Sequence, residues 1–196
     1  MRQMDEGRKI RFLRGKGATD VSSRLPSSGI KSRRMSTDLV FPAQVVLAFA
    51  TIGMLARWYV APRLAGLPRE SALQPLLVVQ AFRYIGLGFL APALVRPSLA
   101  QSFAIPAALG TTLAAMLALA AIAALRARSR LGIPLTWAVS VVGLVDFANA
   151  FVQARGAGVV SDLGAAYYIP IVIVPAAVVS HVMILGILLR RSDNRQ

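Results

Sequence analysis

Residues 132–154 read GIPLTWAVSVVGLVDFANAFVQA. The run is almost wholly apolar and is long enough to cross a bilayer as an α-helix, which takes about 20 residues. Its small and polar residues recur every three or four positions, as one face of a helix requires; they are Thr136, Ser140, Gly143, Asp146, Asn149 and Gln153. Such a stripe is typical of a membrane helix that faces protein. We therefore expect a packing face, whose Asp146–Asn149–Gln153 part is also suited to line a polar cavity.

Four similar stretches accompany this one, and the five together predict the fold class. Barrel strands do not explain them, because such strands are about 10 residues long and alternate apolar with polar residues. Of the 196 residues, 56% are hydrophobic, above the roughly 45–50% of a soluble domain. We expect an all-α membrane bundle, with residues 35–192 forming one domain. Its spans are expected at about 39–60, 71–95, 102–125, 132–154 and 164–189.

The composition excludes several kinds of site. The absence of cysteine rules out disulfides, thiolate catalysis and cysteine-ligated metals, and one histidine cannot build a metal cage. No phosphate loop, nucleophile elbow or zinc-protease motif is present. The net charge of +14 comes mostly from the first 34 residues and from helix ends, where cations act as topology signals. We expect no nucleic-acid partner, and the residues favour a non-enzymatic role.

Residues 1–34 differ in kind from the rest of the chain. They hold ten basic and three acidic residues and no apolar stretch. We expect a disordered basic tail, either one that lies on an anionic membrane surface or sequence upstream of a native start at Met35. A nucleic-acid-binding arm is the less favoured alternative.

The arginines near the span ends predict an orientation. Nine lie in the first and third loops and at the C-terminus, against two in the second and fourth loops. Because cationic loops stay in the cytoplasm, we expect the C-terminus inside and, with five spans, the N-terminus outside. A short acidic start at Met35 agrees with this orientation, whereas residues 1–34 would carry ten cations across. The alternative is a genuine cytoplasmic tail with the inverted topology.

Away from the span ends, three charged or titratable side chains lie inside the predicted spans: Arg83, Asp146 and His181. A charge in hydrocarbon costs about 2.5–3.5 kcal/mol even on lenient scales, so such residues mark candidate sites. At about 1.5 Å per residue, Arg83 and Asp146 lie about 18 and 21 Å above the cytoplasmic side, and His181 about 12 Å above it. We therefore expect an Arg83–Asp146 ion pair. For His181 we favour a neutral ring bonded to a backbone carbonyl over a proton relay.

Neighbouring polar residues extend this candidate site. Gln80, Arg83 and Tyr84 are expected on one face of the second span, with Gln44 and Thr51 of the first span placed to join them. The full predicted intramembrane polar site is Arg83, Asp146, Asn149, His181, Gln80 and Gln153.

Prolines indicate where the helices begin. Those near the span starts suit first helical turns, and they are Pro42, Pro75, Pro106, Pro134 and Pro170. Pro175 instead lies within the fifth span, where it is expected to free the carbonyl of Ile171 and kink the helix.

Several short motifs resemble those of a known group of proteins. They are Phe82-Arg83-Tyr84-Ile85-Gly86 with Phe89-Leu90, Phe103-Ala104-Ile105-Pro106-Ala107 before Gly110, Gly143 with Asp146, and Ile169-Pro170 with Val174-Pro175 and His181. Over roughly residues 40 to 190 the chain resembles small uncharacterised bacterial multi-helix membrane proteins. The resemblance implies a multi-pass protein of the bacterial plasma membrane and no known substrate. In such relatives an acidic residue often follows the glycine of the third span, whereas Thr111 follows Gly110 here, so an activity that needs this acid is in doubt.

Three functions stay open at this point. The first is a structural or assembly protein, whose polar stripe packs helices and whose partners are the lipid bilayer and a second copy or another membrane protein. The second is a small permease or proton-linked carrier that uses Arg83, Asp146 and His181, although five spans do not divide into equal repeats. The third is a cofactor-binding protein, with His181 ligating haem in an oligomer. The sequence favours the first and identifies no cofactor.

Overall fold

The computed structural model describes residues 28–190. These residues are helical throughout their regular structure, with no strand among them. Five helical segments are long and apolar enough to cross a membrane, and they are Leu39–Ala65, Arg69–Leu90, Gln101–Arg126, Gly132–Arg155 and Gly164–Leu189. The predicted all-α class with five such helices is thus confirmed for this part of the chain.

The predicted tail falls mostly outside the described residues, which begin at Ser28. Residues 28–34, expected to be disordered, instead form the first turns of α1 (Ser28–Leu55). The described residues divide into two units between Ser36 and Thr37, and the packed helices belong to the second unit.

The first two spans are each built from more than one kind of helix. In the first, α1 is followed by a π-helical turn, η1 (Ala56–Val60), and by α2 (Ala61–Ala65). In the second, α3 (Arg69–Ala81) runs into a 3₁₀-helix, η2 (Phe82–Leu90). Helix η2 ends at Leu90 and not at the expected residue 95, because Pro92 follows and disfavours helical backbone just before it.

The last three spans are more regular. The third is α4 (Gln101–Arg126) and the fourth is α5 (Gly132–Ala157). Two 3₁₀ turns follow, η3 (Val159–Asp162) before the fifth span and η4 (Gly164–Tyr167) at its start. The fifth span begins with η4 and continues through a π-helical turn, η5 (Ile169–Ile173), into α6 (Val174–Leu189).

Prolines fit the expected helix starts only in part. Pro134 and Pro170 lie in first turns as predicted, whereas Pro42, Pro75 and Pro106 lie inside α1, α3 and α4. Helix α1 begins well before the expected residue 39, whereas α3 and α4 begin within two residues of the expected starts, so Pro75 and Pro106 lie beyond the first turn in either case. Pro175 is at the beginning of α6, directly after the π-helical turn η5, so the predicted irregularity in this span is present.

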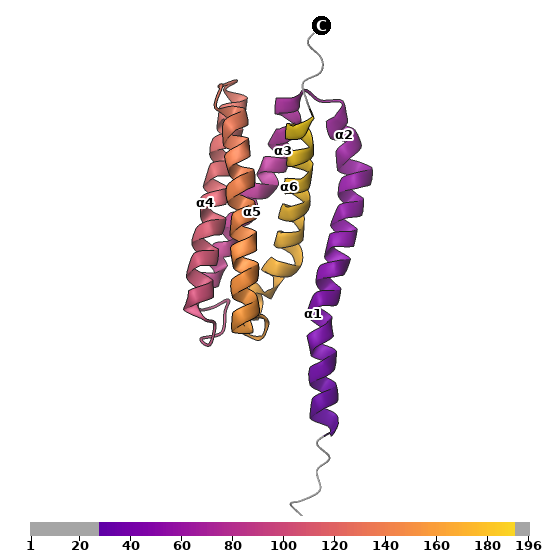
Figure 1. The fold of residues 1–196 in the computed structure, drawn as a ribbon, viewed down its shortest axis with the longest axis vertical. Helices are drawn as coiled ribbons and strands as arrows, with labels where there is room; N and C mark the ends of the chain where they lie inside the picture. Colours follow the sequence, from indigo (N-terminus) through magenta and orange to yellow (C-terminus); the bar gives the residue numbers. More distant parts are fainter. Residues whose placement is uncertain (1–27, 191–196) are drawn as a thin grey trace, which may run out of the picture. The chain divides into compact units, whose positions relative to one another are not determined.

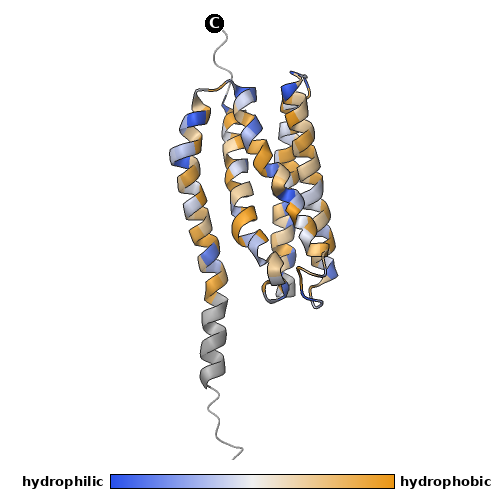
Figure 2. Ribbon diagram, turned by 180° about the vertical axis from the view of Figure 1, so that it is seen from behind, coloured by the Kyte–Doolittle hydropathy of each residue, from blue (hydrophilic) through white to orange (hydrophobic). Residues whose placement is uncertain are grey.

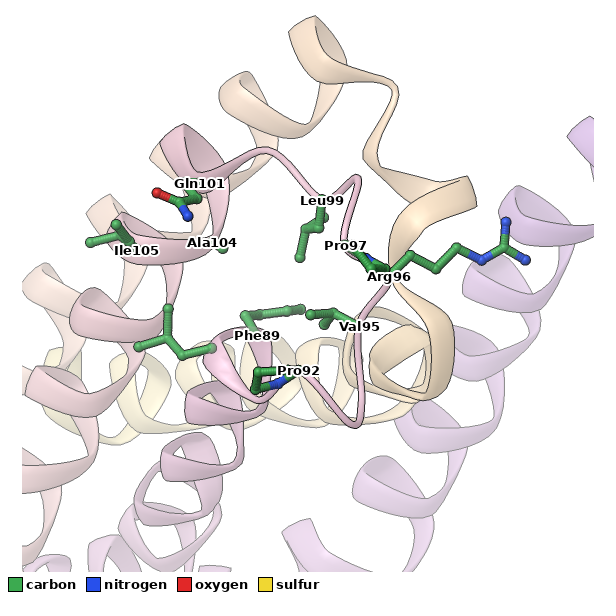
Figure 3. A pocket seen from close by; sticks show the side chains of 10 residues that line it. Phe89, Pro92, Val95, Arg96, Pro97, Leu99, Gln101, Ala104 and Ile105 are labelled. Carbon is green, nitrogen blue, oxygen red and sulfur yellow. The ribbon is translucent and has the colours of Figure 1, made fainter.

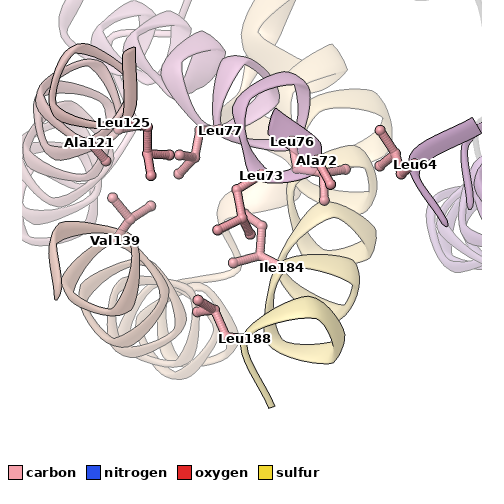
Figure 4. Packing of buried hydrophobic residues seen from close by; sticks show 11 residues of the cluster. Leu64, Ala72, Leu73, Leu76, Leu77, Ala121, Leu125, Val139, Ile184 and Leu188 are labelled. Carbon is pink, nitrogen blue, oxygen red and sulfur yellow. The ribbon is translucent and has the colours of Figure 1, made fainter. Parts of the chain in front are cut away.

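Helices α3, α4, α5 and α6 pack together. Helix α4 lies along α5, and α3 contacts both α4 and α6 (Figure 1). Their shared apolar core includes Leu73 and Leu77 of α3, Val139 of α5 and Ile184 of α6 (Figure 4). Apolar residues continue along the full length of α4, α5 and α6 (Figure 2).

Helix α4 has two contrasting faces. Its inward face is formed largely by alanines that are almost fully buried, among them Ala108, Ala114 and Ala118. Small residues let neighbouring helices approach closely. Its outward face carries large apolar side chains that are 52–60% exposed, and these are Leu109, Leu113, Met116 and Leu119. That outward face is suited to a hydrocarbon environment.

Candidate functional site

Arg83, Asp146 and His181, which lie away from the ends of their spans, meet at one place. Arg83 of η2 donates from Nη2 to Oδ2 of Asp146 on α5 at 2.5 Å, and their side chains are 1% and 5% exposed. Nη1 of Arg83 lies 3.3 Å from the carbonyl oxygen of Gly143 and 3.3 Å from Nε2 of His181 on α6. The contact expected between Arg83 and Asp146 is therefore present and joins the second and fourth spans, and His181 adds the fifth.

His181 differs from its expected role. Its ring is fully buried, its Nε2 faces Arg83, and its Nδ1 has no hydrogen-bond partner among the described residues. A guanidinium can only donate, so Nε2 accepts and the ring is neutral with its hydrogen on Nδ1. The predicted bond to a backbone carbonyl is wrong. Because α3 packs directly on α6, the long Arg83 side chain bridges the expected difference in height.

The 3₁₀ geometry of η2 explains which residues accompany Arg83. A 3₁₀-helix has three residues per turn, so residues three apart share a face. The buried residues of η2 are Arg83, Gly86 and Phe89, which follow this period. Tyr84, expected beside Arg83, is 54% exposed and points elsewhere. The expectation for Tyr84 was wrong because it assumed α-helical spacing.

Phe147 completes the surroundings of the charges and was not predicted. The guanidinium carbon of Arg83 lies 3.9 Å from the centre of the Phe147 ring, in a cation–π arrangement. The same ring meets His181 edge to face, with centroids 5.9 Å apart. In the sequence Phe147 is one of many apolar residues of its span, and only its position next to Asp146 signals this role.

Three glycines make the close approach of these elements feasible. A β-carbon on Gly143 would lie 2.5 Å from Nε2 of His181 and 2.7 Å from Nη1 of Arg83. On Gly110 of α4 it would overlap the carboxylate of Asp146, and on Gly86 it would overlap the side chain of Thr111. Only glycine fits at these positions, so α4 contributes shape to the site although it contributes no charge.

Gln80 lies one turn before Arg83 and serves a different contact. Its Nε2 donates to the carbonyl of Ala177 at 2.8 Å, while its Oε1 has no partner among the residues described. In the opposite direction, Oγ of Ser180 donates to the carbonyl of Leu76 at 2.8 Å. These two bonds connect α3 and α6 reciprocally.

The outer part of the predicted polar site lies apart from the charges. Asn149 is exposed, and its Oδ1 accepts from Nε2 of Gln153 at 2.8 Å. Gln44 accepts a hydrogen bond from the hydroxyl of Tyr167, and Thr51 is exposed. The expectation that Gln44 and Thr51 join Arg83 is wrong.

The arrangement defines what the site can do chemically. It neutralises one positive and one negative charge internally and presents no exposed nucleophile. His181 offers no accessible nitrogen to a haem iron, because Nε2 is against Arg83 and the ring is buried. No group of three histidine or acidic residues suited to a metal ion occurs in the described part of the chain.

Comparison with known proteins gives a family and no activity. Neither the search of curated proteins nor the search of solved structures found a match. A family model described as a domain of unknown function, DUF8737, matches residues 40–189. This stretch contains nearly all of the first apolar helix, all of the other four and the whole of the charged site. The chain therefore belongs to the DUF8737 family.

Proposed function

We propose that this protein is a multi-pass membrane protein with a structural or assembly role, in which the Arg83–Asp146 pair fixes how the spans pack. The observation that supports this proposal most is the buried 2.5 Å contact between the two side chains. Both charges are matched inside the bundle, and the remaining donors of Nη1 are directed at Gly143 and His181. Neither of the two cavities described for this structure is lined by any of these residues.

Lipid is the partner that the outward faces favour. Large apolar side chains are exposed on α4, α5 and α6, for example Leu113, Val145 and Val182 at 54–66%. Exposed apolar surface of this extent is unfavourable in water and suited to a bilayer. We place the protein in a bacterial plasma membrane with its C-terminus in the cytoplasm, on the resemblance and the arginine distribution described above. A second copy or another membrane protein is the further partner of an assembly role.

A proton-linked carrier is the second candidate, and one observation favours it. Four buried polar atoms near the charged site lack partners among the described residues, and they are Gln80 Oε1, Arg83 Nε, Ser140 Oγ and His181 Nδ1. Buried polar atoms without a hydrogen-bond partner are uncommon in proteins, so each of them needs a physical explanation. A site that changes its hydrogen bonding during transport would supply one.

Replacement of the charges distinguishes the two functions. In a structural role, Arg83→Ala or Asp146→Ala leaves one buried charge unmatched and lowers the free energy of unfolding by about 3–5 kcal/mol. The reversed pair Arg83→Asp/Asp146→Arg, or the apolar pair Arg83→Met/Asp146→Leu, then recovers much of the loss. Stability is measured by thermal unfolding of the purified protein in detergent.

A carrier role makes a separate prediction about transport. Vesicles that contain the unchanged protein would take up protons, and vesicles that contain the folded apolar pair would not. Single alanine variants as stable as the unchanged protein would contradict the structural proposal.

A further inference from the structure

A cavity of about 320 Å³ lies where the second span ends and the third begins (Figure 3). Its walls come from the end of η2, the connecting residues 91–100 and the first turn of α4. This volume is at the lower end of the range of small-molecule sites, which is about 300–1,000 Å³. Its lining includes Phe89, Leu90, Val95, Arg96, Leu99, Gln101, Ala104 and Ile105.

The connecting residues are held in place by η3 and η4. The backbone N–H of Arg96 donates to the carbonyl of Asp162 at 3.0 Å, and Oγ of Ser98 donates to Oδ1 of Asp162 at 2.8 Å. The N–H of Ala166 donates to the carbonyl of Leu94 at 3.2 Å. These bonds fix the wall from outside, so the cavity does not depend on a loosely placed loop.

The interior of the cavity is suited to an uncharged apolar group. Phe89, Val95 and Leu99 border the space (Figure 3), and Phe89 and Leu99 are 6–7% exposed. The guanidinium of Arg96 leads away from the cavity, although its backbone forms part of the wall (Figure 3). Gln101 supplies the one uncharged polar side chain of the lining. A charged ligand would find no counter-charge inside.

The rim of the cavity connects two kinds of surface. Leu90 and Ile105 are 46% and 45% exposed, and Ile105 lies one turn from Leu109, which is 60% exposed. This side continues into the outward apolar face of α4. The other side is formed by Pro92 and Pro97 in the connecting residues, beyond the apolar helices. An occupant that reaches both sides has a hydrocarbon part and an end near water.

We propose that this cavity binds an acyl chain of a membrane lipid, which enters between Leu90 and Ile105. The proposal rests on the membrane location proposed above, and it is independent of the role of Arg83 and Asp146. A lipid tail is the apolar chain that the surrounding bilayer supplies at highest concentration, and it needs no charge inside the cavity.

Photolabelling tests this inference directly. The full-length protein is reconstituted in phosphatidylcholine vesicles in which one acyl chain of the lipid carries a diazirine, and labelled residues are located by fragmentation mass spectrometry. We expect label at Leu99, which an acyl chain reaches only from within the cavity. Leu125, which is 3% exposed on the same helix as the cavity wall, is the matched control and is expected to stay unlabelled.

Two variants make the result specific to the cavity. Ala104→Phe fills the space and Ile105→Trp covers the rim, and each is expected to reduce the label at Leu99 at least fivefold. Leu113→Phe, on the exposed face of the same helix, is expected to leave it unchanged. If Ala104→Phe unfolds, Ile105→Trp still decides the question, because its side chain is half exposed.

Two outcomes would overturn the inference. One is label confined to outward residues such as Leu109, which would mean that lipid only surrounds the protein. The other is label at Leu99 that persists in folded Ala104→Phe and Ile105→Trp. Both outcomes are separate from the charge-replacement experiment, since that experiment changes residues that do not line the cavity.

Discussion

Gly110 of α4 lies so close to the carboxylate of Asp146 on α5 that a β-carbon at position 110 would overlap Oδ1. Helix α4, which places no charge in the site, thus limits how near the carboxylate can come to Arg83. This contact explains why a residue without a side chain is needed at position 110. It also makes the packing of α4 on α5 part of the charged site.

Gly110→Ala is therefore expected to destabilise the protein. The added methyl group must push α4 away or displace Asp146 from Arg83, and overpacking of this kind costs about 1–3 kcal/mol. Thermal unfolding in detergent measures the loss. Gly53→Ala is the matched control, because no atom lies within 4 Å of the β-carbon it would add. Equal stability of the two variants would contradict the packing of Gly110 on Asp146.

Gly86 and Thr111 allow a compensation experiment. A β-carbon on Gly86 would overlap Thr111, whose own hydroxyl donates to the carbonyl of Ala107 at 2.7 Å within α4. Gly86→Ala alone is expected to lower the free energy of unfolding by about 1–3 kcal/mol. Adding Thr111→Gly removes the obstructing atoms.

The double variant Gly86→Ala/Thr111→Gly is expected to be more stable than the sum of the two single changes predicts, by about 0.5–3 kcal/mol. A double-mutant cycle of unfolding free energies measures this coupling. Strict additivity would mean that η2 and α4 do not meet at these residues.

His181 is expected to contribute as a hydrogen-bond acceptor for Arg83. His181→Phe keeps an aromatic ring beside Phe147 but removes the acceptor at Nε2, so we expect a loss of about 1–3 kcal/mol. His181→Gln, whose amide oxygen accepts hydrogen bonds, should recover part of it. Val182→Phe, at a position 66% exposed, should change stability by less than about 0.5 kcal/mol. If His181→Phe were as stable as the unchanged protein, the contact of His181 with Arg83 would contribute nothing to the free energy of unfolding.

The five apolar helices could be predicted because each is a long, mostly apolar run, and this signal does not depend on a neighbouring segment. The Arg83–Asp146 contact could be expected because each charge needs a counter-charge and both lie at similar heights. The face of Tyr84 could not, since it depends on the change from α- to 3₁₀-helix at Phe82. The contact of His181 with Arg83 depends on α3 packing beside α6, which hydropathy does not encode.

Packing residues were harder to recognise than charged ones. Phe147 and Gly110 have the residue types of ordinary membrane helices, and their roles follow only from what lies opposite them. The polar stripe of the fourth span was informative in its inner part, where Thr136 and Ser140 are fully buried, and less so at Asn149, which is exposed. A stripe shows which face is polar but not how far along it the neighbouring helices extend.

Substitution of serine by alanine is expected to have opposite effects at two buried positions, Ser180 and Ser140. Oγ of Ser180 donates to the carbonyl of Leu76, whereas Oγ of Ser140 has no partner among the described residues. Ser180→Ala is expected to cost about 0.6 kcal/mol and at most about 1.7 kcal/mol, as interhelical hydrogen bonds do in membranes. Ser140→Ala should be neutral or stabilising, because it removes a buried polar atom without breaking a bond. Unfolding in detergent compares the two, and the reverse order would contradict both assignments.

The orientation of the spans can be tested with single cysteines, because the chain contains none. Arg128 lies between α4 and α5, in the loop expected inside, and Ser161 lies in the loop expected outside; both are exposed. In intact cells a membrane-impermeant maleimide should label Ser161→Cys and leave Arg128→Cys unlabelled until the membrane is permeabilised. The arginine bias of nine against two predicts this result, since cationic loops are retained in the cytoplasm. Labelling of Arg128→Cys in intact cells, with Ser161→Cys protected, would establish the inverted topology and a cytoplasmic N-terminus.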